Sequence, residues 1–254
     1  GRSRLGALLV GAGLAAVLAL LLAGVRYWEG AQVALRPAEW EPLKVHARGE
    51  RLVQWAGGEQ VLTLAPIFAL EGGAAVYPQL VSGPLGFRVA SLMDGEERAR
   101  MGLLGPQELE ALFAADSPSE PPAAVLTGVH DSDSAEEAPL VALAETNGYV
   151  PVPEQEAARL WSRPLATLGE AIRLGAVDLP LRTLAPGTDL LLTFAWQAIQ
   201  PLGRNWNVLV RLVAPDGSDL ARSEGWPLGR PTQDWPAGEV WLDGHPLPIP
   251  GGAA

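Results

Sequence analysis

The sequence LLLTFAWQA at residues 190–198 decides how the C-terminal third of the chain folds. Bulky apolar side chains occupy every second position, which is the period of a half-buried β-strand. Residues 208–212 repeat this alternation, and Pro215-Asp-Gly217 behind them is a turn signal. Another turn, Trp235-Pro-Ala-Gly238, precedes a candidate strand at 239–242. These patterns predict antiparallel strands that are joined by turns.

We therefore predict an antiparallel β-sandwich over residues 166–254. The patterns supply fewer strands than the roughly seven of a typical sandwich. Prolines at positions 246, 248 and 250 follow the last candidate strand. The sandwich is accordingly expected to be truncated.

The preceding region, residues 30–165, alternates short apolar runs with helical patterns. Strand candidates lie at 61–64, 123–128 and 149–152, and helix candidates at 43–56, 105–115 and 139–148. This alternation is typical of a small parallel α/β domain. Ligands of such sheets bind beyond the carboxyl ends of the strands, which here are Ala65-Pro66 and residues 128–131.

The N-terminal segment carries no charge between Arg4 and Arg26. As a helix, residues 5–25 would rise about 31 Å, close to the ~30 Å hydrocarbon core of a bilayer. Tyr27 and Trp28 follow where an interfacial aromatic belt would lie. We predict a transmembrane helix at 5–25, so that the fold class is one membrane span, an α/β domain and an all-β sandwich.

The charges that flank this segment predict its orientation. Arg2 and Arg4 precede it and Arg26 follows it, which favours a cytoplasmic N-terminus. The expected location is the cell membrane, with residues 26–254 extracytoplasmic and the lipid bilayer as a partner. Small residues at every fourth position predict packing against other transmembrane helices, upstream in the polypeptide or in a partner subunit. These small residues are Ala7, Gly11, Ala15, Ala19 and Ala23.

Three other interpretations of the N-terminal segment have less support. A cleaved signal peptide usually has a shorter apolar stretch, of ~7–15 residues, and a small-residue exit that is poor here. Gly11-Ala-Gly13-Leu-Ala-Ala16 fits a dinucleotide fingerprint but lacks the flanking strand and half-exposed helix. A buried core helix is usually shorter.

Composition and motif content exclude several classes of function. The 254 residues include no cysteine and carry a formal net charge of −11. Without cysteine there is no disulfide framework and no thiolate nucleophile or metal ligand. An acidic chain is a poor general nucleic-acid binder, because binding requires a basic face. The sequence also has no Walker-type phosphate loop and no G-x-S-x-G elbow.

Two parts of the sequence resemble a known family. The run Val61–Ala74, VLTLAPIFALEGGA, with Tyr77-Pro78, Ser82-Gly-Pro84 and Phe87-Arg88, looks like the extracytoplasmic tail of bacterial membrane glycosyltransferases. These enzymes resemble the dolichyl-phosphate-mannose–protein mannosyltransferase class. Residues 184–250 are similar to a β-sandwich that follows such enzymes in some bacteria.

The resemblance implies a last membrane helix followed by an extracytoplasmic α/β domain and an extracytoplasmic sandwich. In that class the catalytic acid lies in an early external loop of the membrane body. No position here matches that loop, so no catalytic residue is carried over. Both ends of the chain are expected to be incomplete. The resemblance implies an accessory role, such as acceptor docking or covering the active site.

Five residues are candidate substrate contacts. Glu71 lies in an apolar run before two glycines and is a candidate contact for a sugar hydroxyl, with an ion pair to Arg88 as the structural alternative. Tyr77 and Arg88 belong to the motifs of the resemblance. Trp226 and Trp235 lie beside prolines in predicted loops, where an indole either stacks on a sugar ring or packs into the core.

The sequence predicts no metal site and no cofactor. Asp131-Ser-Asp133 has the D-x-D spacing of some metal-dependent sugar-nucleotide enzymes, but its acidic and polar surroundings favour a solvated loop. His46, His130 and His245 are far apart in the sequence, and we expect each at the surface or in a turn.

Three functions remain open at this stage. In the first, the chain is the accessory part of an integral-membrane glycosyltransferase that uses a lipid-linked sugar. In the second, it is a stand-alone single-span envelope protein with a glycan-binding sandwich. In the third, it is a structural subunit of a membrane complex. No residue of the chain is expected to be catalytic.

Overall fold

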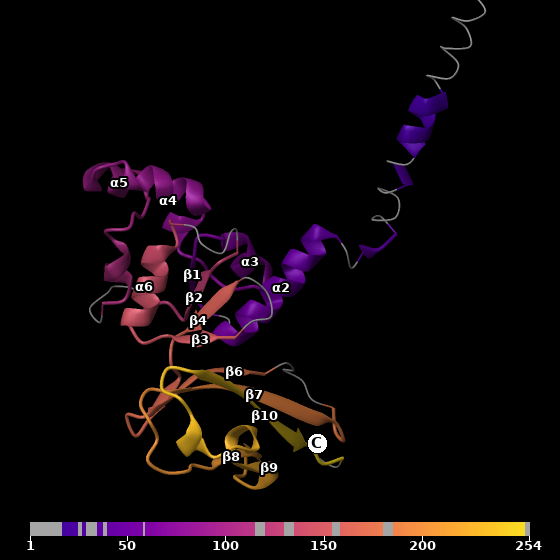
Figure 1. The fold of residues 1–254 in the computed structure, drawn as a ribbon, viewed down its shortest axis with the longest axis vertical. Coiled ribbons are helices and arrows are strands. Elements are labelled where there is room, and N and C mark those ends of the chain that lie inside the picture. The colour runs from indigo at the N-terminus through magenta and orange to yellow at the C-terminus, as the bar shows by residue number, and fades with distance from the viewer. Residues whose placement is uncertain are drawn as a thin grey trace, which may run out of the picture. The chain divides into compact units, whose positions relative to one another are not determined.

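The chain forms two compact units, residues 1–47 and 48–254. The structure, a computed structural model drawn in Figure 1, describes part of each unit. The described residues are 17–24, 27–28, 35–37, 40–57, 59–114, 120–129, 135–153, 158–179 and 185–251.

The first unit contradicts the predicted membrane span. Residues 17–24 are helical there. No helix in the described part of the chain is long and apolar enough to cross a membrane. The transmembrane helix at 5–25 and the cell-membrane location with residues 26–254 extracytoplasmic are therefore unsupported predictions. Residues 5–16 and 25 lie outside the described residues.

The predicted helix-packing stripe falls mostly outside the described residues. Ala7, Gly11 and Ala15 are not described, whereas Ala19 and Ala23 lie in the helical stretch 17–24 and are exposed.

The first sheet of the second unit has the strand order β1-β2-β4-β3. Its strands are β1 (Val61–Thr63), β2 (Ala124–Thr127), β3 (Val150–Val152) and β4 (Arg159–Ser162). β1 and β2 are parallel, whereas β4 is antiparallel to both β2 and β3. The three strands expected from the sequence therefore run in one direction, but β4 is inserted between two of them. The sheet is mixed, and the expectation of a purely parallel sheet is wrong.

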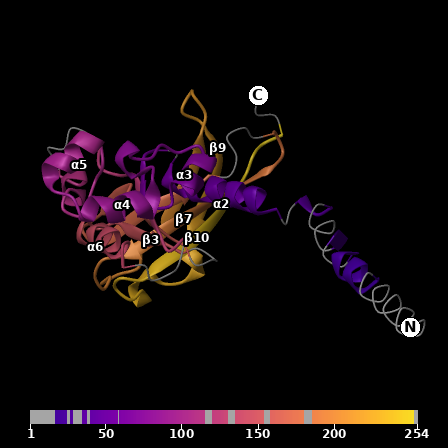
Figure 2. The ribbon, with the colours of Figure 1, turned by 90° about the horizontal axis from the view of Figure 1, so that it is seen from above.

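Helices and single helical turns surround this sheet. They are α2 (Glu41–Ala56), α3 (Pro66–Glu71), η2 (Pro78–Leu80), α4 (Gly83–Ser91), α5 (Gly95–Met101), η3 (Leu109–Leu112) and α6 (Ala138–Thr146). The views in Figures 1 and 2 agree that α4, α5 and α6 gather on one side of the sheet. α3 and α4 each begin with a proline in the first turn, where the missing N–H costs nothing.

The helix expected over 105–115 is reduced to the turn η3. Glu108 Oε2 accepts a hydrogen bond from the Gly105 N–H at 2.9 Å, and Oε1 accepts one from Arg98 Nε, also at 2.9 Å. A side chain that bonds the backbone in this way competes with the helical hydrogen bonds. The segment therefore keeps an irregular start before its single helical turn.

One hydrophobic core lies between this sheet and its helices. It joins Leu62 and Val125 of the strands to Phe87 of α4 and Leu140 of α6, with Leu109 of η3 fully buried among them. Burial of apolar side chains such as these contributes roughly 1.5–3 kcal/mol each. The core fixes the α/β part of the unit.

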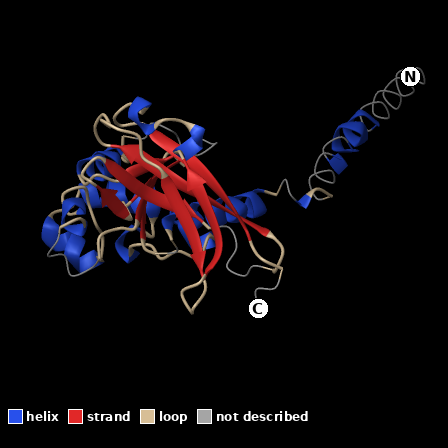
Figure 3. Cartoon of the chain, turned by 90° about the horizontal axis from the view of Figure 1, so that it is seen from below, coloured by secondary structure: helices blue, strands red, loops and turns tan. Residues whose placement is uncertain are grey.

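The remaining strands form a second sheet and a ribbon, all antiparallel. The sheet has the order β10-β7-β6-β5, and β8 pairs with β9. Their bounds are β5 (Ala166–Leu168), β6 (Ile172–Asp178), β7 (Asp189–Ala198), β8 (Val208–Val213), β9 (Asp219–Gly225) and β10 (Val240–Pro248). Two helical turns, η4 (Pro227–Gly229) and η5 (Thr232–Asp234), lie between β9 and β10. Figure 3 draws the strands in red.

Side chains from the sheet and the ribbon share a core. Leu190 of β7, Ala221 of β9 and Leu247 of β10 are buried together, with Val210 of β8 packed against them. The β8–β9 turn matches the signal at Pro215-Asp-Gly217: Gly217 has φ +87°, which favours glycine. The fold is thus mixed α/β with several sheets, and the proposed division between domains at residue 165 stays a prediction.

Candidate functional site

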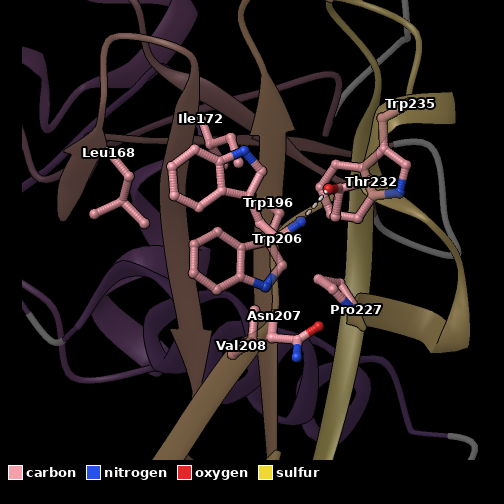
Figure 4. A pocket seen from close by; sticks show the side chains of 9 residues that line it. All are labelled: Leu168, Ile172, Trp196, Trp206, Asn207, Val208, Pro227, Thr232 and Trp235. Atoms are coloured by element: carbon pink, nitrogen blue, oxygen red, sulfur yellow. Dashed lines mark hydrogen bonds between the residues drawn. The ribbon is translucent and has the colours of Figure 1, made fainter. Parts of the chain in front are cut away.

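The β-rich part contains a cavity of about 190 Å³ that we call the tryptophan pocket. Figure 4 shows Trp196 and Trp206 between Leu168 and Ile172 on one side and Thr232, Trp235 and Pro227 on the other. The lining residues are Leu168, Ile172, Trp196, Trp206, Asn207, Val208, Pro227, Thr232 and Trp235. Strands β5, β6 and β7 thus supply one wall, and the turns η4 and η5 supply the other.

Hydrogen bonds hold the loop that carries Trp206. The backbone N–H of Trp206 donates to Thr232 Oγ1 at 2.8 Å, and the backbone N–H of Gln233 donates to Asn205 Oδ1 at 3.1 Å. Thr232 Oγ1 also donates to the Arg204 carbonyl at 3.4 Å. Because Thr232 is buried, its two hydrogen bonds are partly shielded from water, whereas the bond between Gln233 and Asn205 is exposed. The loop and the turn η5 therefore form one pre-organised rim.

Stacked aromatic rings support the pocket from behind. Trp235 stacks on Trp241 with ring centroids 5.7 Å apart, and Trp196 stacks on Phe194 at 5.9 Å. Trp196 and Trp235 are buried, whereas 38% of Trp206 is exposed. Two fixed indoles and one accessible indole therefore face the same space.

Few polar groups accompany this apolar wall. Asn207 is exposed at the open edge, and the Arg204 guanidinium carbon lies 3.9 Å from the centroid of the Trp206 ring. The indole N–H groups of Trp196 and Trp235 are buried and have no hydrogen-bond partner among the described residues. An apolar cavity with a small number of polar groups at its edge is the usual form of a small-ligand site.

Of the two tryptophans expected to contact a ligand, one lines the pocket. Trp235 is 4% exposed and forms part of the wall. Trp226 is 45% exposed and is not among the lining residues, although the adjacent Pro227 is. The roles of both as ligand contacts stay predictions.

The other three predicted contacts lie in the α/β part and are not brought together. Glu71 is exposed at the end of α3. Tyr77 is buried, and its hydroxyl donates to the Glu120 carbonyl at 3.4 Å. Arg88 pairs with Glu136 at 2.8 Å, beside a second cavity of about 230 Å³, and not with Glu71.

Burial changes the chemistry of Tyr77. Desolvation raises the pKa of the Tyr77 phenol to about 12, although the positive charge of Arg163 opposes the shift. The phenol therefore stays neutral at physiological pH. Its position in the hydrophobic core indicates a packing role.

The carboxyl ends of β1 and β2, where the sequence predicts a ligand, are closed by the chain itself. The Ala65 N–H donates to Thr63 Oγ1 at 2.9 Å, and the Gly128 N–H donates to Glu137 Oε2 at 2.6 Å. These backbone donors are therefore not free for an anion. Residues 130–134, which include His130, Asp131 and Asp133, lie outside the described residues.

The expectation that His245 lies at the surface is wrong. His245 is 4% exposed, its Nε2 lies 2.7 Å from Asp243 Oδ2, and its Nδ1 lies 3.0 Å from Ser223 Oγ. A Ser–His–Asp chain is the arrangement of some hydrolases. Ser223, however, lines neither the tryptophan pocket nor the cavity at Arg88, so a ligand in either place does not reach it. The geometry favours a structural role.

The described residues contain no cluster of three or more histidine, aspartate or glutamate side chains that could hold a metal ion. His46 is exposed. The site that sequence reasoning missed is the loop at 204–207, because an isolated Arg-Asn-Trp-Asn carries no motif. Its proximity to Trp235 arises only from the fold.

The comparisons with known proteins add no assignment: no family model, no curated protein and no solved structure matches this chain.

Proposed function

We propose that the chain is an accessory carbohydrate-binding module that holds one pyranose ring in the tryptophan pocket. The observation that carries this proposal is the cavity walled by Trp196, Trp206 and Trp235. The sequence resemblance to glycosyltransferase tails supplies the context, in which glycosyl transfer is catalysed outside this chain. The module would then keep a sugar close to that chemistry.

The size of the pocket favours a single ring. A cavity of about 150 Å³ accepts benzene, and the tryptophan pocket measures about 190 Å³. This volume suits one six-membered ring with small substituents. A longer glycan would place its other rings outside, along the exposed edge at Trp206 and Asn207.

The chemistry of the wall favours a sugar over a purely apolar ring. Indole faces bind the C–H faces of a ring through dispersion and burial. Asn207 supplies both a donor and an acceptor at the open edge, as ring hydroxyls require. The guanidinium on Trp206 adds further donors there.

The test is a titration of the full chain with methyl β-D-glucopyranoside, followed by calorimetry and by tryptophan fluorescence. We expect saturable binding at millimolar concentration. Trp206→Ala should weaken binding about tenfold or more, because it removes the accessible indole. Trp40→Ala is the matched control, since Trp40 is equally large, is 41% exposed against 38% for Trp206, and does not line the pocket.

Two results would overturn the proposal. One is the absence of saturable binding of the pyranoside to a chain whose melting curve shows that it is folded. The other is an equal loss of affinity in Trp40→Ala and Trp206→Ala. Binding of benzene, without binding of the pyranoside, would show an apolar-ring site and would also contradict it.

A further inference from the structure

We propose that Arg204 makes the tryptophan pocket selective for an acidic sugar, a pyranose with an anionic group at the edge of its ring. This inference rests on the proposed function, because it names the class of sugar that the same pocket would prefer. The anionic group is a carboxylate or a phosphate, which share the chemistry that a guanidinium recognises.

Arg204 differs from those arginines of the second unit that form ion pairs. Arg88, Arg98, Arg163 and Arg211 each pair with a carboxylate. Arg204 has no carboxylate partner among the described residues and instead lies over an indole.

Stacking leaves the guanidinium ready to bind. An arginine on an aromatic face keeps N–H donors in its own plane, and two of them match the two oxygens of a carboxylate or phosphate. The ring beneath holds the cation and restricts its rotamers. An anion that reaches Arg204 therefore finds a donor pair whose position is already fixed.

The backbone of Arg204 is fixed as well. Its carbonyl accepts the hydrogen bond from Thr232 Oγ1, and the neighbouring Asn205 and Trp206 are bonded to the same turn. Thr232 itself lines the pocket. Because these bonds fix the position of the cation beside the pocket, little conformational entropy is lost when an anion binds to it.

The position of the cation agrees with the shape of an acidic sugar. The carboxylate of a hexuronic acid and the phosphate of a hexose 6-phosphate both lie outside the ring. A ring seated against Trp206 leaves the anionic group free to extend past that indole toward Arg204, whose guanidinium carbon lies 3.9 Å from the centroid of the indole ring. The apolar interior does not have to bury the charge, which would be costly.

The experiment compares three probes on the full chain: methyl β-D-glucopyranoside, methyl β-D-glucuronide and glucose 6-phosphate. We expect one or both anionic sugars to bind about tenfold more tightly than the neutral one. The preference should shrink in about 0.5 M salt, because Arg204 is exposed and screened. The stronger of the two anionic probes identifies the carboxylate or the phosphate as the group recognised.

Variants assign the preference to Arg204. Arg204→Gln should reduce the affinity for the anionic sugar to that for the neutral one, while the neutral affinity changes less than threefold. Arg204→Lys should keep part of the preference, because lysine keeps the positive charge but lacks the paired N–H donors of the guanidinium. Arg222→Gln is the control, since Arg222 is exposed, does not line the pocket and carries the same charge.

The outcomes separate this inference from the proposed function. Saturable binding with equal affinity for neutral and anionic sugars overturns the inference and leaves the proposed function standing. A preference that survives Arg204→Gln, or that Arg222→Gln abolishes equally, also overturns the inference. Absence of binding by all three probes contradicts the proposed function, and the inference fails with it.

Discussion

His245 Nε2 lies 2.7 Å from Asp243 Oδ2, and both side chains are buried on the inner side of β10. They share that side because residues two apart in a strand point the same way. Asp243 Oδ1 also accepts the Leu228 N–H at 2.8 Å, and His245 Nδ1 contacts Ser223 Oγ of β9. The pair thus joins three segments of the β-rich part: β10, the turn η4 and the ribbon.

We predict that Asp243→Ala lowers the free energy of unfolding by about 2–4 kcal/mol, because the buried His245 and the partly buried Leu228 N–H lose their acceptor. Ser223→Ala should cost about 1–2 kcal/mol, since one bond to His245 is lost. Urea denaturation measures both. Asp189→Asn, at the exposed start of β7, should change less than about 0.5 kcal/mol. Equal effects of Asp189→Asn and Asp243→Ala would contradict the prediction.

The same strand shows how far the sequence predicts this fold. Asp243, His245, Leu247 and Ile249 are buried while residues 244, 246, 248 and 250 are exposed, which is period two. The prolines in this stretch suggest a strand end, yet β10 is the edge of the order β10-β7-β6-β5. An edge strand tolerates proline on the side without a partner. The prolines are therefore compatible both with the end of a strand and with an edge strand. Only the position of β10 in the sheet distinguishes the two, and the sequence does not reveal that position.

Some other elements are likewise predictable from the local sequence, whereas others depend on the sheet. The helix at 43–56 and the strands at 61–64, 123–128 and 149–152 have local signals, and α2, β1, β2 and β3 lie there. β4 is only four residues long, which is too short for a clear strand pattern in the sequence. Its pairing with β2 on one side and β3 on the other stabilises it. Strand order is a long-range property, so the sequence predicts the strands better than the sheet. The tryptophan pocket needs that order, because its walls come from β5, β6, β7, the loop that leads into β8 and the turns η4 and η5.

Gly49 allows α2 to approach the end of α3 closely. A Cβ at Gly49 would overlap the Phe68 carbonyl oxygen and would lie 2.9 Å from the Gly72 nitrogen. We predict that Gly49→Ala lowers the free energy of unfolding by about 1–3 kcal/mol. The overlap with backbone outweighs the ~1 kcal/mol by which alanine favours a helix.

The control for Gly49 is Gly203→Ala. A Cβ at Gly203 meets nothing within 4 Å, so we expect a change below about 0.5 kcal/mol. Urea denaturation of both variants gives the comparison. A Gly49→Ala variant that is more stable than the wild type would show that α2 and α3 are not in close contact.

The buried phenols of Tyr77 and Tyr149 should make the protein less stable at high pH. Burial raises the pKa of Tyr77 to about 12 and also raises the pKa of Tyr149, whose hydroxyl donates to the Pro122 carbonyl. The phenols of the unfolded chain ionise near pH 10. A group whose pKa is raised on folding stabilises fully below the unfolded pKa, and that stability is lost as pH rises through the folded pKa.

We therefore expect the free energy of unfolding to fall between about pH 10 and 12. Tyr77→Phe keeps the ring and should make this fall shallower, and Tyr77→Phe with Tyr149→Phe shallower still. Denaturation by urea at a series of pH values measures the slope. An identical slope for the wild type and the double variant would exclude these phenols as its cause.

At low pH, Glu108 should make the free energy of unfolding fall as pH decreases, which is the opposite direction. Burial alone would raise its pKa, but hydrogen bonds from Arg98 and from the Gly105 N–H outweigh burial and hold the pKa below its ordinary value. A lowered pKa gives stability that is present above the unfolded pKa of about 4.3 and lost as pH falls through the folded pKa. Glu108 is 37% exposed, so solvent screening reduces the size of this effect.

We predict that Glu108→Gln costs about 1–2 kcal/mol near pH 7, because it leaves the buried Arg98 without a carboxylate. The difference from the wild type should shrink as pH falls below about 4, since the wild-type carboxyl is then protonated too. Glu110→Gln, at an exposed position two residues away, should change stability little at either pH. A Glu108→Gln deficit that is the same at pH 3 and pH 7 would mean that packing, and not the Arg98–Glu108 ion pair, carries the stability of this turn.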